Sequence, residues 1–393
     1  MNEAVATRFA EIPKAGLFTP DHDELRSLVR SFVDRDIRPH VERWEEDGEF
    51  PVRELFTQAG LIGLFGAKVE PAFGGTGPDL VADAVITEEL ARCGSGGVAA
   101  ALGAHKDLGS HYLNRFGTDE QRHRWLAPAV AGEKITALAV TESGTGSDVS
   151  AIRTRAERTA AGWTLTGDKT FITNGPIADV LVVAAKTDPD AGHRGITLLV
   201  VEAGQPGFVA RRIDTVGWRT SHTGELAFDR CEVPADGLLG ELNRGFHHIM
   251  ENFQWERVVM ALAAVAAADQ HLELAAAYGR DRHAFGRPVV KFQSWRHRLA
   301  DLATDIEAAR SLAYHALRLM VAGEDATREV SMAKWLATEL DWRAADEALQ
   351  IHGGYGYMME YPVQRAWRDA RLGPIGGGTT EIMKEIIGRS YGL

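Results

Sequence analysis

The hydrophobic pattern of this 393-residue chain changes its period twice. Up to about residue 135 apolar residues recur at helical spacing, and in "TPDHDEL" Thr19 is suited to an N-cap and Pro20 to the first helical position. From about 136 to 240, short runs rich in β-branched residues are separated by turn residues, which favours strands. From about 243 the pattern is helical again and rich in alanine, as in closely packed helices.

This order predicts a mainly α-helical protein with a β domain in the middle. We expect an α-helical N-terminal domain over residues 1–135 and antiparallel strands of a barrel or sandwich over 136–242. A C-terminal helical bundle should occupy 243–393.

Composition argues against several kinds of partner. The formal net charge is -12 and no basic run stands out, so we expect no nucleic-acid binding. We recognise no uninterrupted apolar stretch of about 18 residues and no secretory signal, so we expect no membrane span. Two cysteines, Cys93 and Cys231, fit a reducing cytoplasm, and no cluster of metal ligands is apparent.

Two motifs in the predicted β segment carry groups able to bind a ligand. "TESGTGSD" combines glycines with the hydroxyls of Thr141 and Ser147, although a plain turn explains it equally well. "GDKTFITNG" places Phe171 and Thr173 two residues apart, on one face of a strand. A ring and a hydroxyl so arranged suit a planar heterocycle; a core phenylalanine and a surface threonine are the alternative.

Two further motifs lie in the C-terminal segment. Arg282 in "RDRHAFGRP" has the geometry to bind a pyrophosphate, or it is a solvated basic helix end. In "LQIHGGYGY", Gly353 and Gly354 should end a helix and bring its backbone close to a ligand. The sequence contains no dinucleotide-binding GxGxxG motif after a strand, no P-loop and no GxSxG elbow.

In this order and spacing, the motifs resemble those of the acyl-CoA dehydrogenase family over roughly residues 20 to 390. "TESGTGSD" resembles its TEPGAGSD-type signature, and "QIHGGYGYMMEYPVQRAWRDAR" followed by "GTTEI" resembles its C-terminal signature. The resemblance implies helical N-terminal, β middle and four-helix-bundle C-terminal domains. It also implies noncovalently bound FAD and a homotetramer.

The resemblance assigns roles to residues by their positions in these motifs. Thr141, Ser147, Phe171 and Thr173 should line the flavin. A second group should reach the FAD of a neighbouring subunit: Arg282, Phe285, Gln293, Gln350, Gly353 and Gly354. Thr379 and Glu381 should also lie near FAD, and Ser147, Arg257 and Gly376 near the substrate.

The implied reaction is α,β-desaturation of an acyl thioester, in which a base removes the α-proton and the β-hydrogen leaves as hydride to flavin N5. Many family members carry the base as a Glu just before the Gly-Thr pair, where this chain has Gly377. "FQWERVVMA" resembles the long-chain and isovaleryl-CoA dehydrogenases, whose base is the Glu immediately before an Arg. By that resemblance Glu256, before Arg257, is the base.

Alone, Glu256 would be a surface carboxylate in the first turns of a helix; Glu251 and Glu381 are weaker candidates for the base. By resemblance, the backbone N–H of Gly377 should hydrogen-bond the thioester oxygen. Because Gly376 and Gly377 remove two side chains, we expect the pocket to admit long or branched acyl chains.

Several alternatives remain open from the sequence. The acyl group is carried by CoA or by an acyl-carrier protein, and the electrons pass to an electron-transfer flavoprotein or to oxygen, as in a flavin oxidase. A protein of another class, which binds flavin or acyl thioesters without catalysis, would also explain the glycine at position 377.

Overall fold

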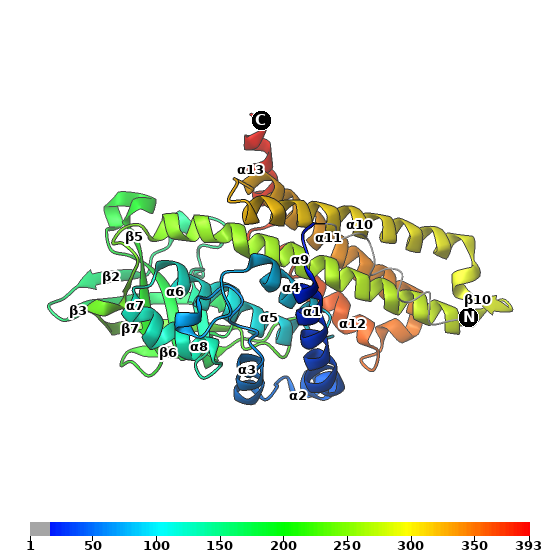
Figure 1. Ribbon diagram of the computed structural model, residues 1–393, viewed down its shortest axis with the longest axis horizontal. Helices are drawn as coiled ribbons and strands as arrows, with labels where there is room; N and C mark the ends of the chain where they lie inside the picture. Colours follow the sequence, from blue (N-terminus) through cyan, green and yellow to red (C-terminus); the bar gives the residue numbers. More distant parts are fainter. Residues whose placement is uncertain (1–15) are drawn as a thin grey trace.

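The computed structural model describes residues 16–393 and contains three successive parts, helical, β and helical (Figure 1). The stretch expected to carry no secretory signal lies largely outside the described residues. The first part contains α1 (Pro20–Phe32), α2 (Val41–Asp47), α3 (Val52–Leu61), α4 (Leu80–Ala91), α5 (Gly96–Ala104), α6 (Ser110–Phe116), α7 (Asp119–Gln121) and α8 (Ala127–Val130). Thr19 is the N-cap residue of α1 and Pro20 its first residue, as the sequence predicted.

The middle part is one sheet. Its strands are β1 (Thr136–Ala139), β2 (Arg155–Arg158), β3 (Gly162–Ile172), β4 (Val180–Lys186), β5 (Ile196–Glu202), β6 (Phe208–Arg212), β7 (Gly224–Pro234) and β8 (Leu238–Leu239). They are ordered β6-β7-β3-β2-β4-β5-β8, with β1 also paired to β4. Pairing is mostly antiparallel, as expected, except that β1 and β2 run parallel to β4.

Strand β4 explains why the middle segment looks so hydrophobic. All seven of its residues are buried, because alternate side chains enter two different core clusters. Val180 and Val182 pack with Tyr112 of α6, while Leu181 and Val183 pack with residues of β3 and β7. A strand covered on both faces gives a continuous apolar run instead of an alternating one.

The last part is built on three long helices, α9 (Gly245–Asp281), α10 (Gln293–Val321) and α11 (Thr327–His352). The short helices α12 (Pro362–Ala370) and α13 (Thr380–Ser390) pack against α11, and the hairpin of β9 (His283–Ala284) and β10 (Arg287–Pro288) joins α9 to α10. Many buried alanines, among them Ala261, Ala268, Ala313 and Ala337, let the long helices approach closely. The structure confirms the predicted fold class of two helical parts around a β part.

Helix α9 is long and apolar enough to cross a membrane by length and composition, although charged residues interrupt its apolar run. Of its most apolar 18-residue window, 61% is buried inside the protein. α9 packs on α4, α10 and α11 and runs from beside the β domain to the far end of the bundle (Figure 1). These contacts make it the central core helix.

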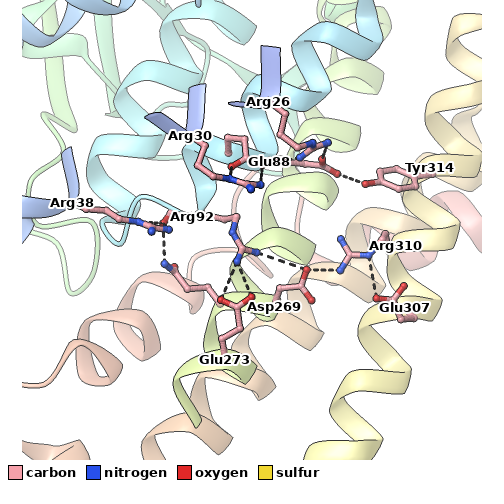
Figure 2. A network of polar contacts seen from close by, with 12 residues as sticks. Arg26, Arg30, Arg38, Glu88, Arg92, Asp269, Glu273, Glu307, Arg310 and Tyr314 are labelled. Carbon is pink, nitrogen blue, oxygen red and sulfur yellow. Dashed lines mark hydrogen bonds and ion pairs between the residues drawn. The ribbon is translucent and has the colours of Figure 1, made fainter. Parts of the chain in front are cut away.

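A polar network joins the N-terminal part to the bundle (Figure 2). Glu88 of α4 accepts hydrogen bonds from Arg26 of α1 and from the hydroxyl of Tyr314 of α10, both at 2.6 Å. Below it in the figure, Arg310 of α10 pairs with Asp269 of α9. These bonds link α1 and α4 to the bundle helices α9 and α10.

Candidate active site

The glycine turn between α12 and α13 faces the middle of α9. A Cβ atom placed on Gly377 would lie 3.6 Å from Oε1 of Glu256, so the two residues are neighbours in the folded chain. Gly377 and Gly378 have φ angles of +62° and +97°, which side chains other than hydrogen rarely tolerate. The missing carboxylate at 377 and the carboxylate at 256 therefore border the same space.

Glu256 is partly accessible, and desolvation by the surrounding protein raises the pKa of its carboxyl group to about 7. Arg257 and Lys334 lower that pKa, while the carboxylate of Asp107 raises it, and desolvation outweighs all three. Within residues 16–393 the Glu256 carboxylate has neither a hydrogen bond nor an ion pair. A desolvated carboxylate without a partner is a base close to neutral pH.

The alternative that Glu256 is a carboxylate in the first turns of a helix is wrong. Helix α9 begins at Gly245, eleven residues before Glu256, so the carboxylate does not lie in the helix's first turns. The helical turns before Glu256 are packed into the protein, since Ile249 and Asn252 on them are buried. The helix N-terminus is therefore too distant to favour the ionised carboxylate.

Two cations hold the glycine turn. Arg257, which is 6% exposed, donates from Nε to the carbonyl of Gly377 at 3.4 Å. Lys334 of α11 is fully buried and donates from Nζ to the carbonyls of Gly373 (2.9 Å) and Gly378 (2.6 Å). Among the described residues the N–H of Gly377 has no acceptor, so it is available to a ligand.

The space beside the glycines is only partly open. A Cβ on Gly377 would overlap Sδ of Met260, one turn after Glu256 on α9, whereas a Cβ on Gly376 would lie 3.6 Å from Cε of the same residue. Met260 therefore occupies part of the volume expected to hold the acyl chain. The expectation of a pocket for long or branched chains stays a prediction and now depends on Met260 moving.

Thr379 and Glu381 begin α13. The hydroxyl of Thr379 caps the helix by accepting from the N–H of Ile382 at 3.4 Å. Glu381 is exposed, and hydrogen bonds at the helix N-terminus lower the pKa of its carboxyl group. An ionised, solvated carboxylate is a poor base, so Glu381 remains the weaker candidate. Glu251, the other one, forms an ion pair with Arg115 at the surface.

The "TESGTGSD" loop follows β1. A buried ion pair holds it: Nζ of Lys169 lies 2.8 Å from Glu142, which also accepts from the N–H groups of Arg153 and Thr154. The carbonyl of Thr141 accepts from Thr170 of β3 at 2.9 Å, and Ser147 is exposed. A Cβ on Gly144 or Gly146 would meet nothing within 4 Å, so the loop presents open backbone.

The prediction that Phe171 and Thr173 share one face of a strand is wrong. Strand β3 ends at Ile172, and its pairing with β7 shifts register between Lys169 and Ile172. Phe171 has a left-handed backbone (φ 59°), and its side chain is 66% exposed. Thr173 lies beyond the strand end. Strained backbone residues cluster at active sites and ligand-binding sites, so Phe171 stays a candidate ligand contact.

The remaining predicted cofactor residues lie around the β9–β10 hairpin, at the end of the bundle farthest from the β domain (Figure 1). Phe285 at its tip has φ 48° and is 95% exposed, and the guanidinium of Arg282 has no hydrogen bond or ion pair among residues 16–393. The ring of Tyr278 stacks on His352 at 3.9 Å, bringing the end of α9 to the end of α11, where Gly353 follows with φ 58°. Gln293 and Gln350 are exposed, and Gly353 and Gly354 have open space where a Cβ would project.

Apart from Thr379 and Glu381 at the start of α13, the predicted cofactor residues form two groups in one chain, one on the β domain and one at the distal end of the bundle. Each group combines an exposed phenylalanine in left-handed backbone with open glycine backbone. These features fit a planar group with a phosphate chain.

Sequence reasoning missed Lys334, Met260 and the Glu142–Lys169 pair. For Lys334 the signal was present: a lysine in "VSMAKWLATEL" occupies the apolar stripe that Val330 and Ala337 define, and the structure buries all three completely. Among residues 16–393 there is no group of three or more His, Cys, Asp or Glu side chains that could hold a metal ion.

Comparisons with known proteins match most of the described chain. Residues 19–133, 137–231 and 243–392 match the models of the N-terminal, middle and C-terminal domains of acyl-CoA dehydrogenases. The long-chain specific acyl-CoA dehydrogenase of Sus scrofa mitochondria is 39% identical over 387 residues, covering 98% of this chain and 89% of that protein.

Two more relatives agree. The mitochondrial isovaleryl-CoA dehydrogenase of Solanum tuberosum is 37% identical over 384 residues, covering 97% of this chain and 93% of that protein. Among solved structures, an acyl-CoA dehydrogenase from Geobacillus kaustophilus is 42% identical with a TM-score of 0.93, covering 96% of this chain and 99% of that one.

Proposed function

The chain belongs to the acyl-CoA dehydrogenase family of FAD-dependent oxidoreductases, and from that premise we propose that Glu256 is the base that removes the α-proton of its acyl-CoA substrate. The observation that carries the proposal is the approach of Glu256 Oε1 to within 3.6 Å of a Cβ position on Gly377. The carboxylate that the turn lacks is supplied from α9.

The condition of Glu256 supports this role. A general base works best with a pKa near the operating pH, and burial raises the pKa of this carboxyl group to about 7. Its lack of any hydrogen-bond or ion-pair partner in the described chain leaves both oxygens free for the proton. Arg257 is committed to the carbonyl of Gly377 and serves to hold the turn.

The N–H of Gly377 is the proposed donor to the thioester oxygen, which gains negative charge as the α-proton leaves. Its freedom from internal hydrogen bonds supports the assignment, since a donor already in use would have to break a bond first. Ser147, Arg257 and Gly376 remain proposed substrate-side residues.

The proposed FAD residues are those of the two groups described above, together with Thr379 and Glu381. When bound, FAD accepts the β-hydrogen of the substrate as hydride. Because the two groups lie apart in one chain, we propose a homo-oligomer, a homotetramer by family resemblance, in which neighbouring subunits complete each FAD site.

The remaining assignments are also proposals. The domains span residues 1–135, 136–242 and 243–393. The protein is cytoplasmic, consistent with its free, buried Cys93 and Cys231. An electron-transfer flavoprotein takes the electrons. Acyl-carrier-protein substrates and direct oxidation by oxygen are the alternatives, which assays with matched acyl-CoA and acyl-carrier substrates and a peroxide assay in air distinguish.

The test is anaerobic mixing of the FAD-loaded protein with acyl-CoA thioesters of graded length and branching. We expect the oxidised flavin absorbance to bleach in the wild-type protein and to bleach at least about 10²-fold more slowly in Glu256→Gln, with FAD binding retained. Wild-type-like bleaching in Glu256→Gln would refute the base. No bleaching with any thioester would favour a protein that only binds flavin or thioesters, and strict preference for butyryl-CoA would contradict the long-chain pocket.

A further inference from the structure

Lys334 is an ammonium group enclosed in the helical bundle. It is fully buried on α11 between Val330 and Ala337, and desolvation lowers its pKa to about 8. No carboxylate of the described chain lies within ion-pair distance of it. Its partners are instead two backbone carbonyls of the glycine turn, those of Gly373 and Gly378.

Gly377 lies in the short stretch of turn between the two carbonyls that Lys334 holds. Arg257 holds the carbonyl of Gly377 from α9, while Lys334 holds the next carbonyl, that of Gly378, from α11. Only the φ and ψ angles of Gly377 separate its N–H from its own carbonyl, since each peptide unit is planar. Fixing successive carbonyls therefore restricts the direction of the N–H, which glycine alone would leave free.

Lys334 also acts on Glu256 through its charge. The charged and titratable groups around that carboxylate are Arg257 on its own helix, Lys334 on α11, Asp107 in the π-helical segment His105–Gly109, and Tyr112 on α6. Lys334 is the cation among them contributed by another element, and its charge lowers the pKa of Glu256. It opposes the desolvation that would otherwise keep the base protonated.

We propose that Lys334 is a positioning residue of the dehydrogenation: from inside the bundle it aims the Gly377 N–H at the thioester oxygen and keeps a positive charge beside Glu256. The inference rests on the proposed function of those two residues. It predicts that one buried lysine governs both the stabilisation of the developing negative charge and the pH at which the base is active.

Exchange of the α-hydrogen tests this without hydride transfer. The probe is 3-thiaoctanoyl-CoA, in which sulfur replaces the β-carbon, so the α-proton can be removed but no β-hydrogen can leave. FAD-loaded protein is incubated with the probe in D₂O, and deuterium at C2 is followed by mass spectrometry across a pH series. In Lys334→Met we expect the plateau rate to fall about 10-fold or more. The pH midpoint should rise by about one unit, because a carboxylate that loses a nearby cation has a higher pKa.

Three matched variants make the outcome decisive. Lys384→Met removes an exposed lysine of α13 and should leave plateau and midpoint unchanged. Lys334→Arg keeps the charge and should retain the midpoint. If Lys334→Met does not fold, Lys334→Gln retains a donor for the turn and is expected to show the same upward shift.

An unchanged midpoint in the charge-removing variants overturns the inference, even if the plateau and the melting temperature fall together, because a purely structural lysine would give that result. Absence of exchange in the wild-type protein, or undiminished exchange in Glu256→Gln, refutes the proposed base and with it the role of Lys334. Exchange that depends on Glu256 but not on Lys334 refutes only the present inference.

Discussion

Two sets of buried charges lie against the same half of α9, and they are built differently. In the first, here called the quartet, Lys68, Asp83, Lys106 and Asp107 bond to one another, with Lys106 at 2.7 Å from Asp83 and 2.6 Å from Asp107. In the second, Arg257 and Lys334 donate to backbone carbonyls, and Glu256 has no bonded partner in the described chain.

The neighbouring residue Trp255 belongs to the quartet. Its indole N–H donates to Asp107 at 2.9 Å, and Nζ of Lys68 lies 4.5 Å from its ring centre. The quartet thus anchors the helix turn from which Glu256 projects. The comparison shows that a balanced set of buried charges fixes structure, whereas a set whose cations are used elsewhere leaves a carboxylate free for chemistry.

The largest expected effect comes from unbalancing the quartet. Lys106→Met leaves two buried carboxylates with one ammonium, and we expect it to lower the free energy of unfolding by about 3–5 kcal/mol. Thermal and urea denaturation measure the loss. Lys106→Met combined with Asp83→Asn restores neutrality and should recover most of it; equal losses in both variants would show that charge balance is not what stabilises the quartet.

At Glu256 we expect a substitution to raise the free energy of unfolding instead of lowering it. Its pKa is about 7 in the folded protein against 4.5 as the reference value, so the folded state binds more protons between these pH values and stability falls as pH rises through them. Glu256→Gln should therefore raise the free energy of unfolding by up to about 3 kcal/mol above pH 7 and by less than about 1 kcal/mol near pH 5. Denaturation at about pH 5 and about pH 8.5 measures this, and a gain independent of pH would contradict it.

The backbone of the glycine turn gives the next effect. Gly377→Ala forces a side chain into left-handed backbone and against Met260, and should lower stability by about 2 kcal/mol. Gly376→Ala is the matched control, since its Cβ would have 3.6 Å of clearance from Met260 and its φ is not positive; a change below about 0.5 kcal/mol is expected.

Adding Met260→Ala to Gly377→Ala separates the two causes. Met260→Ala removes the overlap but not the backbone strain. Gly377→Ala should therefore lower the melting temperature less when it is added to Met260→Ala than when it is added to the wild-type protein. Full recovery would mean that the left-handed conformation of Gly377 costs an alanine nothing.

The smallest effect belongs to the surface pair of Glu251 and Arg115. The Glu251 side chain is 45% exposed, so Glu251→Gln should change the free energy of unfolding by less than about 0.5 kcal/mol. Flavin reduction by acyl-CoA should keep its wild-type rate. A loss of reduction comparable with that of Glu256→Gln would transfer the role of base to Glu251.

Local pattern was enough to predict the three parts and several helix ends. Thr19 and Pro20 start α1, and Thr118 with Gln121 forms a capping box at the start of α7, because capping depends on residues close in sequence. Pattern failed where pairing was not local. The parallel pairs of β4 with β1 and β2, and the bulge that turns Phe171 outward, depend on strands distant in the chain.

By itself, the sequence determined the family, the fold class and the coincidence of a glycine at 377 with a glutamate at 256. Only the tertiary structure decided that these two residues are neighbours, that Met260 occupies space beside Gly377, and that Lys334 donates to carbonyls of the turn. The physical reason is that α9, α11 and the glycine turn converge through helix packing, and desolvation at their meeting point sets the pKa of Glu256. Neither effect is encoded in the spacing of residues along one segment.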